Sequence, residues 1–121
     1  MRDIRKYEVF ALADRLVLKV YHLTAGFPSD EKFGLTSQLR RAACSIPINL
    51  AEGAARASAK EFANFVNIAA GSCEEVRYEI HLAAELGYLK AEEQKALDAE
   101  YETVKKMLSR LLAVVSGRSG K

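Results

Sequence analysis

The sequence predicts an all-α protein, an antiparallel up-down-up-down four-helix bundle whose second helix is kinked near Pro47. Three observations predict this fold. The 121 residues are 50% hydrophobic, which is enough for one buried core. Two prolines and seven glycines are too few for a many-stranded β-fold. Apolar residues recur at helical spacing in four stretches joined by short turns. We expect a single domain over residues 1–116 and a short, basic, frayed tail over 117–121.

The first helix is predicted from Ile4 to Thr24, with Asp3 as its N-cap. Its apolar residues fall within one half of the helix circumference: Val9, Phe10, Leu12, Ala13, Leu16, Val17, Val20, Tyr21 and Leu23. This stripe is wider than one neighbouring helix requires, so we expect two neighbours, one of which could belong to another subunit. A glycine and a proline then end the helix, in the segment 26–30.

The second helix begins at Asp30 or Leu35 and ends at Glu52, because Gly53 follows. Pro47 lies inside it, where proline removes a backbone hydrogen bond and usually bends the helix. Two shorter helices that meet near Pro47 are the alternative, and one kinked helix is the preferred interpretation.

The third and fourth helices have the clearest boundaries. Ser58 and Glu61 have the spacing of a capping box, and Gly87 is the expected stop of the third helix. The fourth helix is predicted from Ala91 to Val115, with apolar residues at heptad spacing. These residues are Leu97, Tyr101, Val104, Leu108, Leu111 and Val115.

The formal net charge of +2 conceals an uneven distribution. Residues 1–34 carry +1, residues 35–60 carry +3, residues 61–103 carry −7 and residues 104–121 carry +5. Such a chain presents surfaces of opposite sign. The isoelectric point of 8.6 lies below the value of about 9 that is typical of dedicated nucleic-acid-binding domains.

The sequence predicts a cytoplasmic protein. Residues 1–3 lead directly into a mixed-charge amphipathic stretch, which is unlike a signal peptide, and no apolar run is long enough to span a membrane. Cys44 and Cys73 lie far apart without a metal-binding spacing, so two buried, reduced thiols are expected, and one disulfide is the alternative.

The sequence contains no motif that indicates an enzyme, a metal site or a cofactor. Neither His22 nor His81 follows a glutamate by three positions, which excludes the usual metal motif of helical bundles. No glycine-rich phosphate loop occurs, and no histidine accompanies a candidate serine or cysteine nucleophile. We therefore expect no catalytic residue, no cofactor and no small-molecule substrate. The glutamates of the third helix (Glu74, Glu75, Glu79 and Glu85) are expected to be solvated or paired with Arg77.

Gln38, Arg41, Ser45, Asn49 and Glu52 form a polar stripe along the second helix, because they follow one another in steps of three or four. Three interpretations stay open: an exposed face, a partly buried hydrogen-bonded stripe that fixes packing register, and a surface that faces a ligand or nucleic acid. The second is favoured. An enzyme would need an unrecognised site between subunits around Arg41, Asn49 and Glu52.

The strings FPSDEKFGLTSQLRRAACSIPINLAEGAAR and FANFVNIAAGSCEEV resemble the "four helix bundle protein" family. This family was first noticed as reading frames inside intervening sequences of bacterial large-subunit ribosomal RNA genes. The resemblance runs from the first helix to about Leu89. It implies a four-helix protomer that assembles into a homopentamer, without defined catalytic residues. A similar fold occurs in the accessory variability determinant of diversity-generating retroelements, a basic pentamer that binds reverse transcriptase and nucleic acid.

Two functional hypotheses follow. The first is a non-enzymatic homo-oligomer, with pentamer implied by the resemblance, that binds RNA or DNA through basic surfaces. The candidate contacts are Arg56, Lys60, Lys105, Lys106, Arg110 and Arg118, with Arg2, Arg5, Lys6 and Lys121 nearby. The second is a protein–protein adaptor whose acidic surface, from residues 61–103, docks a basic partner. No membrane partner is expected.

Overall fold

Four α-helices and two short 3-10 turns make up the fold, in a computed structural model that describes residues 2–117. The α-helices are α1 (Glu8–Thr24), α2 (Leu35–Ala54), α3 (Ala59–Glu85) and α4 (Ala91–Val115). The 3-10 turns η1 (Ile4–Lys6) and η2 (Ser29–Glu31) precede α1 and α2. Residues 2–117 form no β-strand, so the predicted all-α four-helix fold is confirmed. The predicted tail lies outside the described residues, apart from Gly117.

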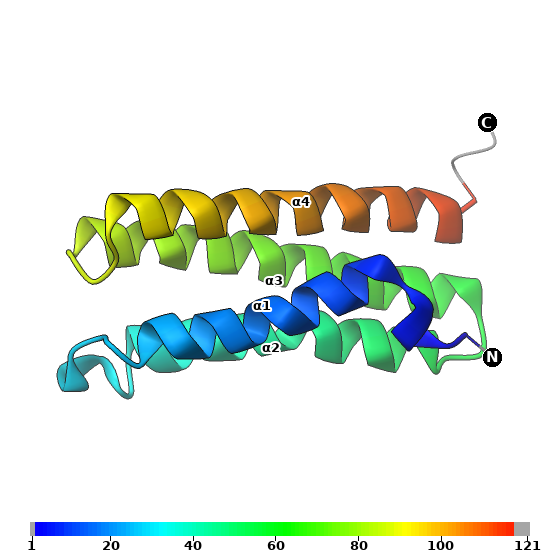
Figure 1. Cartoon of the computed structure of the whole chain (residues 1–121). Helices are drawn as coiled ribbons and strands as arrows, with labels where there is room; N and C mark the ends of the chain where they lie inside the picture. The colour runs from blue at the N-terminus through cyan, green and yellow to red at the C-terminus, as the bar shows by residue number, and fades with distance from the viewer. Residues whose placement is uncertain (1, 118–121) are drawn as a thin grey trace.

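The helices lie side by side, with the α1–α2 and α3–α4 connections at one end of the bundle (Figure 1). The α2–α3 connection lies at the opposite end, together with the start of α1 and the end of α4. The most extensive packing is between α2 and α3, followed by α3 with α4 and α1 with α2. Between residues 2 and 117, no helix is both long and apolar enough to cross a membrane.

The start of the first helix differs from the prediction. Asp3 acts as an N-cap, since its carboxylate accepts a hydrogen bond from the Arg5 amide at 3.1 Å, but it caps the short turn η1. Tyr7 then adopts an extended backbone, with φ −90° and ψ 125°, and α1 begins only at Glu8. The Tyr7 ring packs edge-on against Phe62 of α3, with centroids 6.1 Å apart. The helix is therefore interrupted at Tyr7, where the ring packs on Phe62, and a single helix from Ile4 would lack this interruption.

α2 continues as one helix through the buried residue Pro47, so the alternative of two shorter helices is wrong. It begins at Leu35, whose amide donates to Glu31 Oε1 at 3.0 Å. The other carboxylate oxygen of Glu31 accepts a hydrogen bond from the Tyr88 hydroxyl at 2.9 Å. Glu31 therefore satisfies a free amide at the start of α2 and ties this end to the α3–α4 connection.

Gly53 permits the close approach of α2 and α3. A Cβ atom there would lie 2.6 Å from the Phe65 Cβ and 2.9 Å from the Phe62 Cδ1. Both distances are too short for carbon atoms in contact, so only glycine fits without movement of α3.

The predicted boundaries of α3 and α4 agree closely with the structure. The Ser58 hydroxyl oxygen accepts from the Glu61 amide at 3.1 Å, which is the expected N-cap of α3. Gly87 adopts φ +82°, and the Tyr88 amide donates to the Ala83 carbonyl at 2.8 Å. This is the Schellman ending that a glycine after a helix favours. α4 spans Ala91–Val115, as predicted.

The apolar stripe of α1 is only partly buried within the chain. Val9, Ala13, Leu16 and Val20 lie in the core. Phe10 and Val17, together with Cys44, Pro47, Ile48 and Ala51 of α2, instead line an open apolar groove of about 340 Å³ between the two helices.

Candidate nucleic-acid interface

Basic residues from three separate segments lie towards the same end of the bundle. Arg2 precedes α1, Arg56 and Lys60 flank the start of α3, and Arg110 lies in the last third of α4. Figure 1 shows these segments at the end that holds the α2–α3 connection. Arg110 also lines a hollow with Tyr7 and Glu8, which places it beside the start of α1. We call Arg2, Arg56, Lys60 and Arg110 the basic end.

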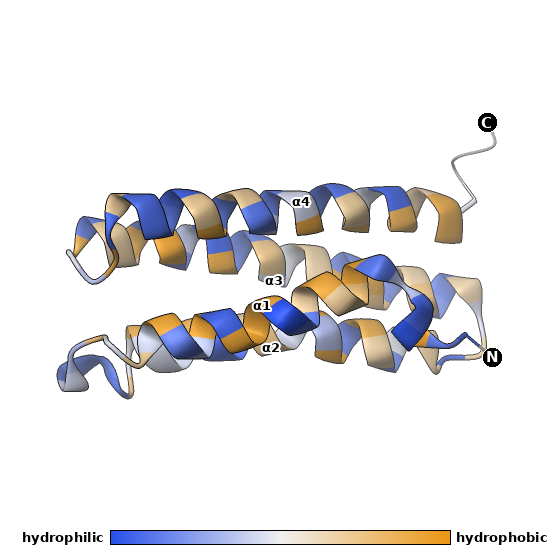
Figure 2. Cartoon of the chain, viewed as in Figure 1, coloured by the Kyte–Doolittle hydropathy of each residue, from blue (hydrophilic) through white to orange (hydrophobic). Residues whose placement is uncertain are grey.

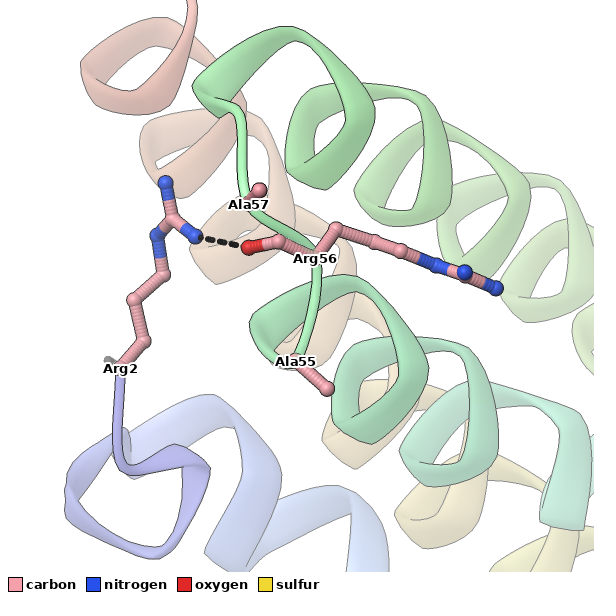
Figure 3. Close-up of a pocket in the computed structure, with 4 residues that line it drawn as sticks. All are labelled: Arg2, Ala55, Arg56 and Ala57. Carbon is pink, nitrogen blue, oxygen red and sulfur yellow. Dashed lines mark hydrogen bonds between the residues drawn. The ribbon is translucent and has the colours of Figure 1, made fainter.

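Arg2 and Arg56 line an open depression of about 530 Å³ (Figure 3). The Arg2 Nη1 donates to the Arg56 carbonyl oxygen at 3.0 Å, and the Arg2 guanidinium lies 4.8 Å from the centroid of the Phe62 ring. The Arg56 side chain points away from Arg2 and stacks over Phe65 at 5.0 Å. Each aromatic ring holds a guanidinium in place while leaving N–H donors free, which suits recognition of a phosphate.

The turn between α2 and α3 positions Arg56 and Lys60. Arg56 follows the end of α2 by two residues, and its amide donates to the Gly53 carbonyl at 3.1 Å. Ser58 then caps α3, which places Lys60 in the first helical turn. The N-terminus of a long helix carries a partial positive charge that adds to these side chains.

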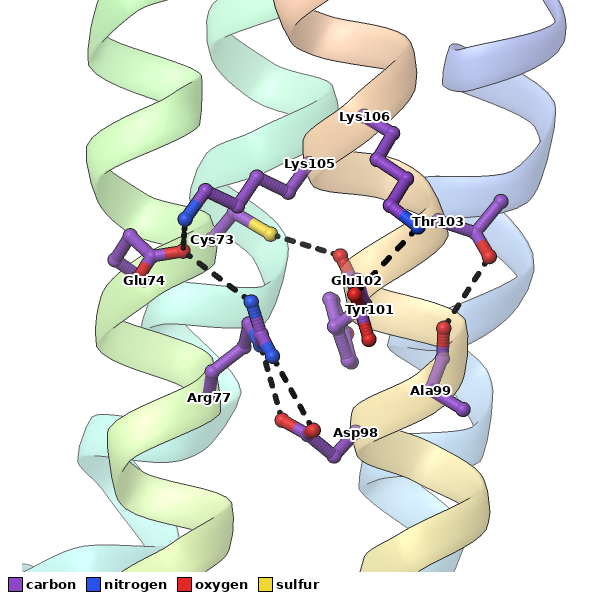
Figure 4. Close-up of polar contacts among 10 residues, drawn as sticks. All are labelled: Cys73, Glu74, Arg77, Asp98, Ala99, Tyr101, Glu102, Thr103, Lys105 and Lys106. Atoms are coloured by element: carbon purple, nitrogen blue, oxygen red, sulfur yellow. Dashed lines mark hydrogen bonds and ion pairs between the residues drawn. The ribbon is translucent and has the colours of Figure 1, made fainter.

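Lys105 and Lys106 are committed to ion pairs within the chain (Figure 4). The Lys105 Nζ lies 2.9 Å from Glu74 Oε1, and the Lys106 Nζ lies 3.5 Å from Glu102 Oε2. The four side chains are 45–67% exposed, so each pair is worth only about 0–1 kcal/mol and competes poorly with a phosphate. Both lysines thus remain accessible, but they carry less unbalanced charge than the sequence suggested.

Of the candidate contacts Arg110 and Arg118, only Arg110 lies within the described residues. Arg110 is exposed and forms no ion pair within residues 2–117. Together with Lys105, Lys106 and Ser109, it lines a groove of about 410 Å³ along α4. Arg118 lies outside the described residues.

Arg77 organises the middle of the α3–α4 contact. Its guanidinium donates to both carboxylate oxygens of Asp98, at 3.0 and 3.3 Å, and lies 3.6 Å from Glu74. Figure 4 shows Arg77 between the two acidic groups. The expected pairing of an α3 glutamate with Arg77 is confirmed for Glu74.

The polar stripe of α2 is hydrogen-bonded only in its centre. The Ser45 hydroxyl lies 2.7 Å from the Ser72 hydroxyl of α3, and the Asn49 side-chain amide donates to Ser45 Oγ at 2.9 Å. Both residues are partly buried, whereas Gln38, Arg41 and Glu52 are exposed. Ser45 thus links α2 to Ser72 of α3, and the Asn49 side chain holds Ser45 in place.

Glu79 is an exception to the expected solvation of the α3 glutamates. It is 5% exposed, and its Oε1 has no hydrogen-bond partner within the described structure. Burial, followed by the negative charge of Glu75, raises the pKa of Glu79 to about 7. The folded chain therefore keeps this proton to a higher pH than an unfolded glutamate does. The resulting stabilisation is present at acidic pH and is lost as the pH rises towards 7.

The remaining titratable groups do not form a recognisable catalytic arrangement within residues 2–117. Burial raises the pKa of the Cys73 thiol to about 11, and its Sγ donates to the Tyr101 carbonyl oxygen at 3.3 Å, so it is a poor nucleophile. Both cysteines are free thiols, although Cys44 is only partly buried. His22 and His81 are exposed. No group of three or more metal-ligating side chains occurs in this part of the chain.

Comparison with known proteins identifies the family. The model of the 23S rRNA-intervening sequence protein family matches residues 5–110. The chain belongs to this family. The fold is also similar to the crystal structure of a protein of unknown function from the S23 ribosomal protein family of Bacteroides thetaiotaomicron. That similarity has a TM-score of 0.80 at 22% identity and covers 86% of this chain and 94% of the other. No curated protein matches the chain.

The segment matched by the 23S rRNA-intervening sequence protein family includes most of the candidate contacts. Arg56, Lys60, Lys105, Lys106 and Arg110 all lie within residues 5–110, as does the whole polar stripe. Arg2 and Arg118 lie outside it. Sequence reasoning identified these basic residues one by one, but it gave no sign that Arg2 and Arg56 stack on Phe62 and Phe65.

Proposed function

We propose that this member of the 23S rRNA-intervening sequence protein family is a non-enzymatic, cytoplasmic homo-oligomer, pentameric in its assembled form, that binds RNA through its basic end. The observation that carries the proposal is the location of Arg2, Arg56, Lys60 and Arg110, from three separate segments, at the same end of the bundle. The family's name supports RNA over DNA as the ligand.

The charge balance of these residues supports binding to phosphates. Arg56, Lys60 and Arg110 form no ion pair within residues 2–117, so each can exchange a counterion for a phosphate. Lys105 and Lys106 extend the basic area along α4 at little cost, since their ion pairs are exposed. One end supplies few contacts, and an oligomer multiplies them by avidity. A pentamer would carry a net charge of about +10, five times the +2 of one chain.

The fold proposal is an antiparallel up-down-up-down path with α2 kinked at Pro47. The short connections support the path, and the missing amide hydrogen of Pro47 supports the kink. This path would bring the start of α1, the α2–α3 turn and the end of α4 to the same end of the bundle, as RNA binding requires.

Fluorescence anisotropy of a labelled RNA hairpin tests the proposed interface. The test variant combines Arg56→Gln, Lys60→Gln and Arg110→Gln. The control combines Lys32→Gln, Lys90→Gln and Lys95→Gln, which remove the same charge near the opposite end and are also exposed. We expect the test variant to weaken binding at least about tenfold and the control less than about threefold, because contacts act locally while net charge acts through screened solvent. Equal effects would contradict an RNA site at the basic end.

The adaptor alternative makes the opposite prediction. A partner docked directly on the acidic surface of α3 and α4 would remain bound after nuclease treatment of a cell extract. Partners bridged by RNA would be lost. Several of those acidic residues are already paired, with Arg77, Lys105, Lys106 or Lys19, which favours RNA binding over the adaptor.

A further inference from the structure

Two neighbouring helices carry long segments without any charged residue. Residues 42–51 of α2 and residues 62–73 of α3 contain no Asp, Glu, Lys or Arg. The second segment makes about three full turns, so it presents uncharged side chains in every direction, including towards solvent. The two segments pack on each other, since Ser45 and Ser72 are hydrogen-bonded at 2.7 Å. We call their solvent-facing surface the uncharged band.

Large apolar side chains are exposed on this band. Ile48 of α2 and Ile68 of α3 are each 52% exposed. Ile48 also lines the apolar groove between α1 and α2, together with Phe10, Val17 and Pro47. A helix surface that faces only water normally carries charged residues, and a contiguous apolar surface usually marks an interaction site.

The surface of α4 provides the contrast. From Glu92 to Arg110 of α4, acidic and basic side chains recur, and several form ion pairs with α1 or α3. In Figure 2 hydrophilic residues recur along α4 except at its C-terminal end, where residues 111–115 are apolar. The α4 side is therefore charged along most of its length, whereas the uncharged band carries no charged side chain.

We propose that the uncharged band is the contact between copies of this chain, with the α1–α2 groove of one copy receiving the Ile68 side of α3 from the next. This inference rests on the proposed homo-oligomer and assigns its interface. The occupant is a second copy of the chain, because the α1–α2 face is hollowed where the α3 face exposes Ile68, and the charges at the edges of the two faces are opposite in sign.

The charges at the edges of the two faces are complementary. Arg41 borders the α2 face, and Glu75 borders the α3 face. Both residues are exposed, and neither forms an ion pair within residues 2–117. A second copy would place Glu75 against Arg41.

The polar groups between these edges are also matched. Asp14 lines the α1–α2 groove, and Glu52 lies on the exposed side of α2. The α3 face offers Asn64 and Asn67, both exposed, whose side-chain amides can donate to carboxylates. The contact would therefore bury apolar side chains without leaving these two charges unsatisfied.

Two different faces in contact make a heterologous interface. Because the two faces adjoin each other along α2, repetition of the contact curves the assembly, and such a contact closes into a ring when the rotation permits. α4 stays outside the contact, which leaves Lys105, Lys106 and Arg110 available for RNA.

Light scattering of two charge-insertion variants tests the interface. Ile48→Glu disables the groove face and Ile68→Glu disables the α3 face. Val114→Glu is the matched control, because Val114 is 65% exposed on α4, outside the band. We expect each Ile variant alone to have the mass of one 13.4 kDa chain and the control to keep the wild-type mass. Circular dichroism verifies folding, and Ile48→Ser and Ile68→Ser replace any variant that does not fold.

A mixing experiment gives the sharpest outcome. Each Ile variant retains one intact face, so an equimolar mixture should form a two-chain complex and nothing larger. Dimers formed by either variant alone, a mixture that stays monomeric, or variants that keep the wild-type mass would each overturn the inference. If wild type is oligomeric while the variants are unchanged, only this interface is wrong. If wild type itself is monomeric at micromolar concentration, the proposed homo-oligomer is wrong as well.

A charge-swap series tests the edges independently. Arg41→Glu and Glu75→Arg should each weaken assembly at least about tenfold, and the double variant should restore it, because the opposite charges would again face each other. Failure of the double variant to restore assembly would contradict the proposed pairing of these edges.

Discussion

Gly53→Ala should destabilise the protein, although glycine to alanine in a helix usually has the opposite effect. The added Cβ would lie 2.6 Å from the Phe65 Cβ, an atom fixed to the α3 backbone, and 2.9 Å from the fully buried Phe62 ring. Relief of the overlap requires α2 and α3 to separate by several tenths of an ångström along their most extensive contact.

The expected magnitude follows from two opposing terms. Overpacking of a buried contact costs about 1–3 kcal/mol, and we expect the upper part of that range because Phe65 cannot yield by a change of rotamer. Higher helix propensity returns about 1 kcal/mol. The free energy of unfolding should therefore fall by about 1–2 kcal/mol, which corresponds to a Tm lower by about 4–8 °C for a chain of this size.

Gly71→Ala is the matched control. Gly71 also lies inside a helix, and a Cβ there would have no atom within 4 Å. This variant should be as stable as wild type or more stable by up to about 1 kcal/mol. Urea unfolding followed by circular dichroism, at equal chain concentration, measures both variants. A Gly53→Ala variant as stable as wild type would refute the close contact between α2 and α3.

Three further predictions concern buried or paired polar groups. The unfolding free energy of wild type should fall between pH 5 and 7, because the folded chain binds the Glu79 proton more tightly than the unfolded chain does. Glu79→Gln should remove most of this pH dependence and add about 1–3 kcal/mol at pH 8, and an unchanged pH dependence would contradict the pKa of about 7. Tyr101→Phe should raise the unfolding free energy by about 1 kcal/mol, because the buried Tyr101 hydroxyl has no partner in the described structure. A decrease in the unfolding free energy of more than about 1 kcal/mol would instead reveal an unrecognised hydrogen bond. A double-mutant cycle of Arg77→Ala and Asp98→Ala should give a coupling of about 1 kcal/mol, and additive effects would show that the bidentate pair contributes nothing.

The helix boundaries were predictable where local signals determine them. Ser58 and Gly87 mark the two ends of α3 through hydrogen bonds to residues within one turn, so the sequence reveals them directly. The start of α1 was not predictable. Tyr7 breaks the helical backbone where its ring packs on Phe62, and this partner is 55 positions away in the sequence.

The candidate site was predictable in its members but not in its geometry. Arg56, Lys60 and Arg110 are recognisable as basic residues from their local charge balance, whereas their location at the same end depends on the path of the helices. Burial of Glu79 left a weak signal that was missed. It lies three positions after Val76 and four before Ala83, and that spacing places it on the same side of α3 as these apolar residues. From the sequence alone, a charged residue at such a position is expected to be exposed.

The salt dependence of RNA binding tests the central claim most directly. Each phosphate contact that is lost should reduce the slope of log K against log salt concentration by about 0.7–0.9. The variant that combines Arg56→Gln, Lys60→Gln and Arg110→Gln should therefore show a slope smaller in magnitude by about 2–3 than wild type. The control with Lys32→Gln, Lys90→Gln and Lys95→Gln should keep the wild-type slope. Equal slopes for the two variants, or RNA binding by wild type that does not depend on salt, would contradict a phosphate-binding basic end.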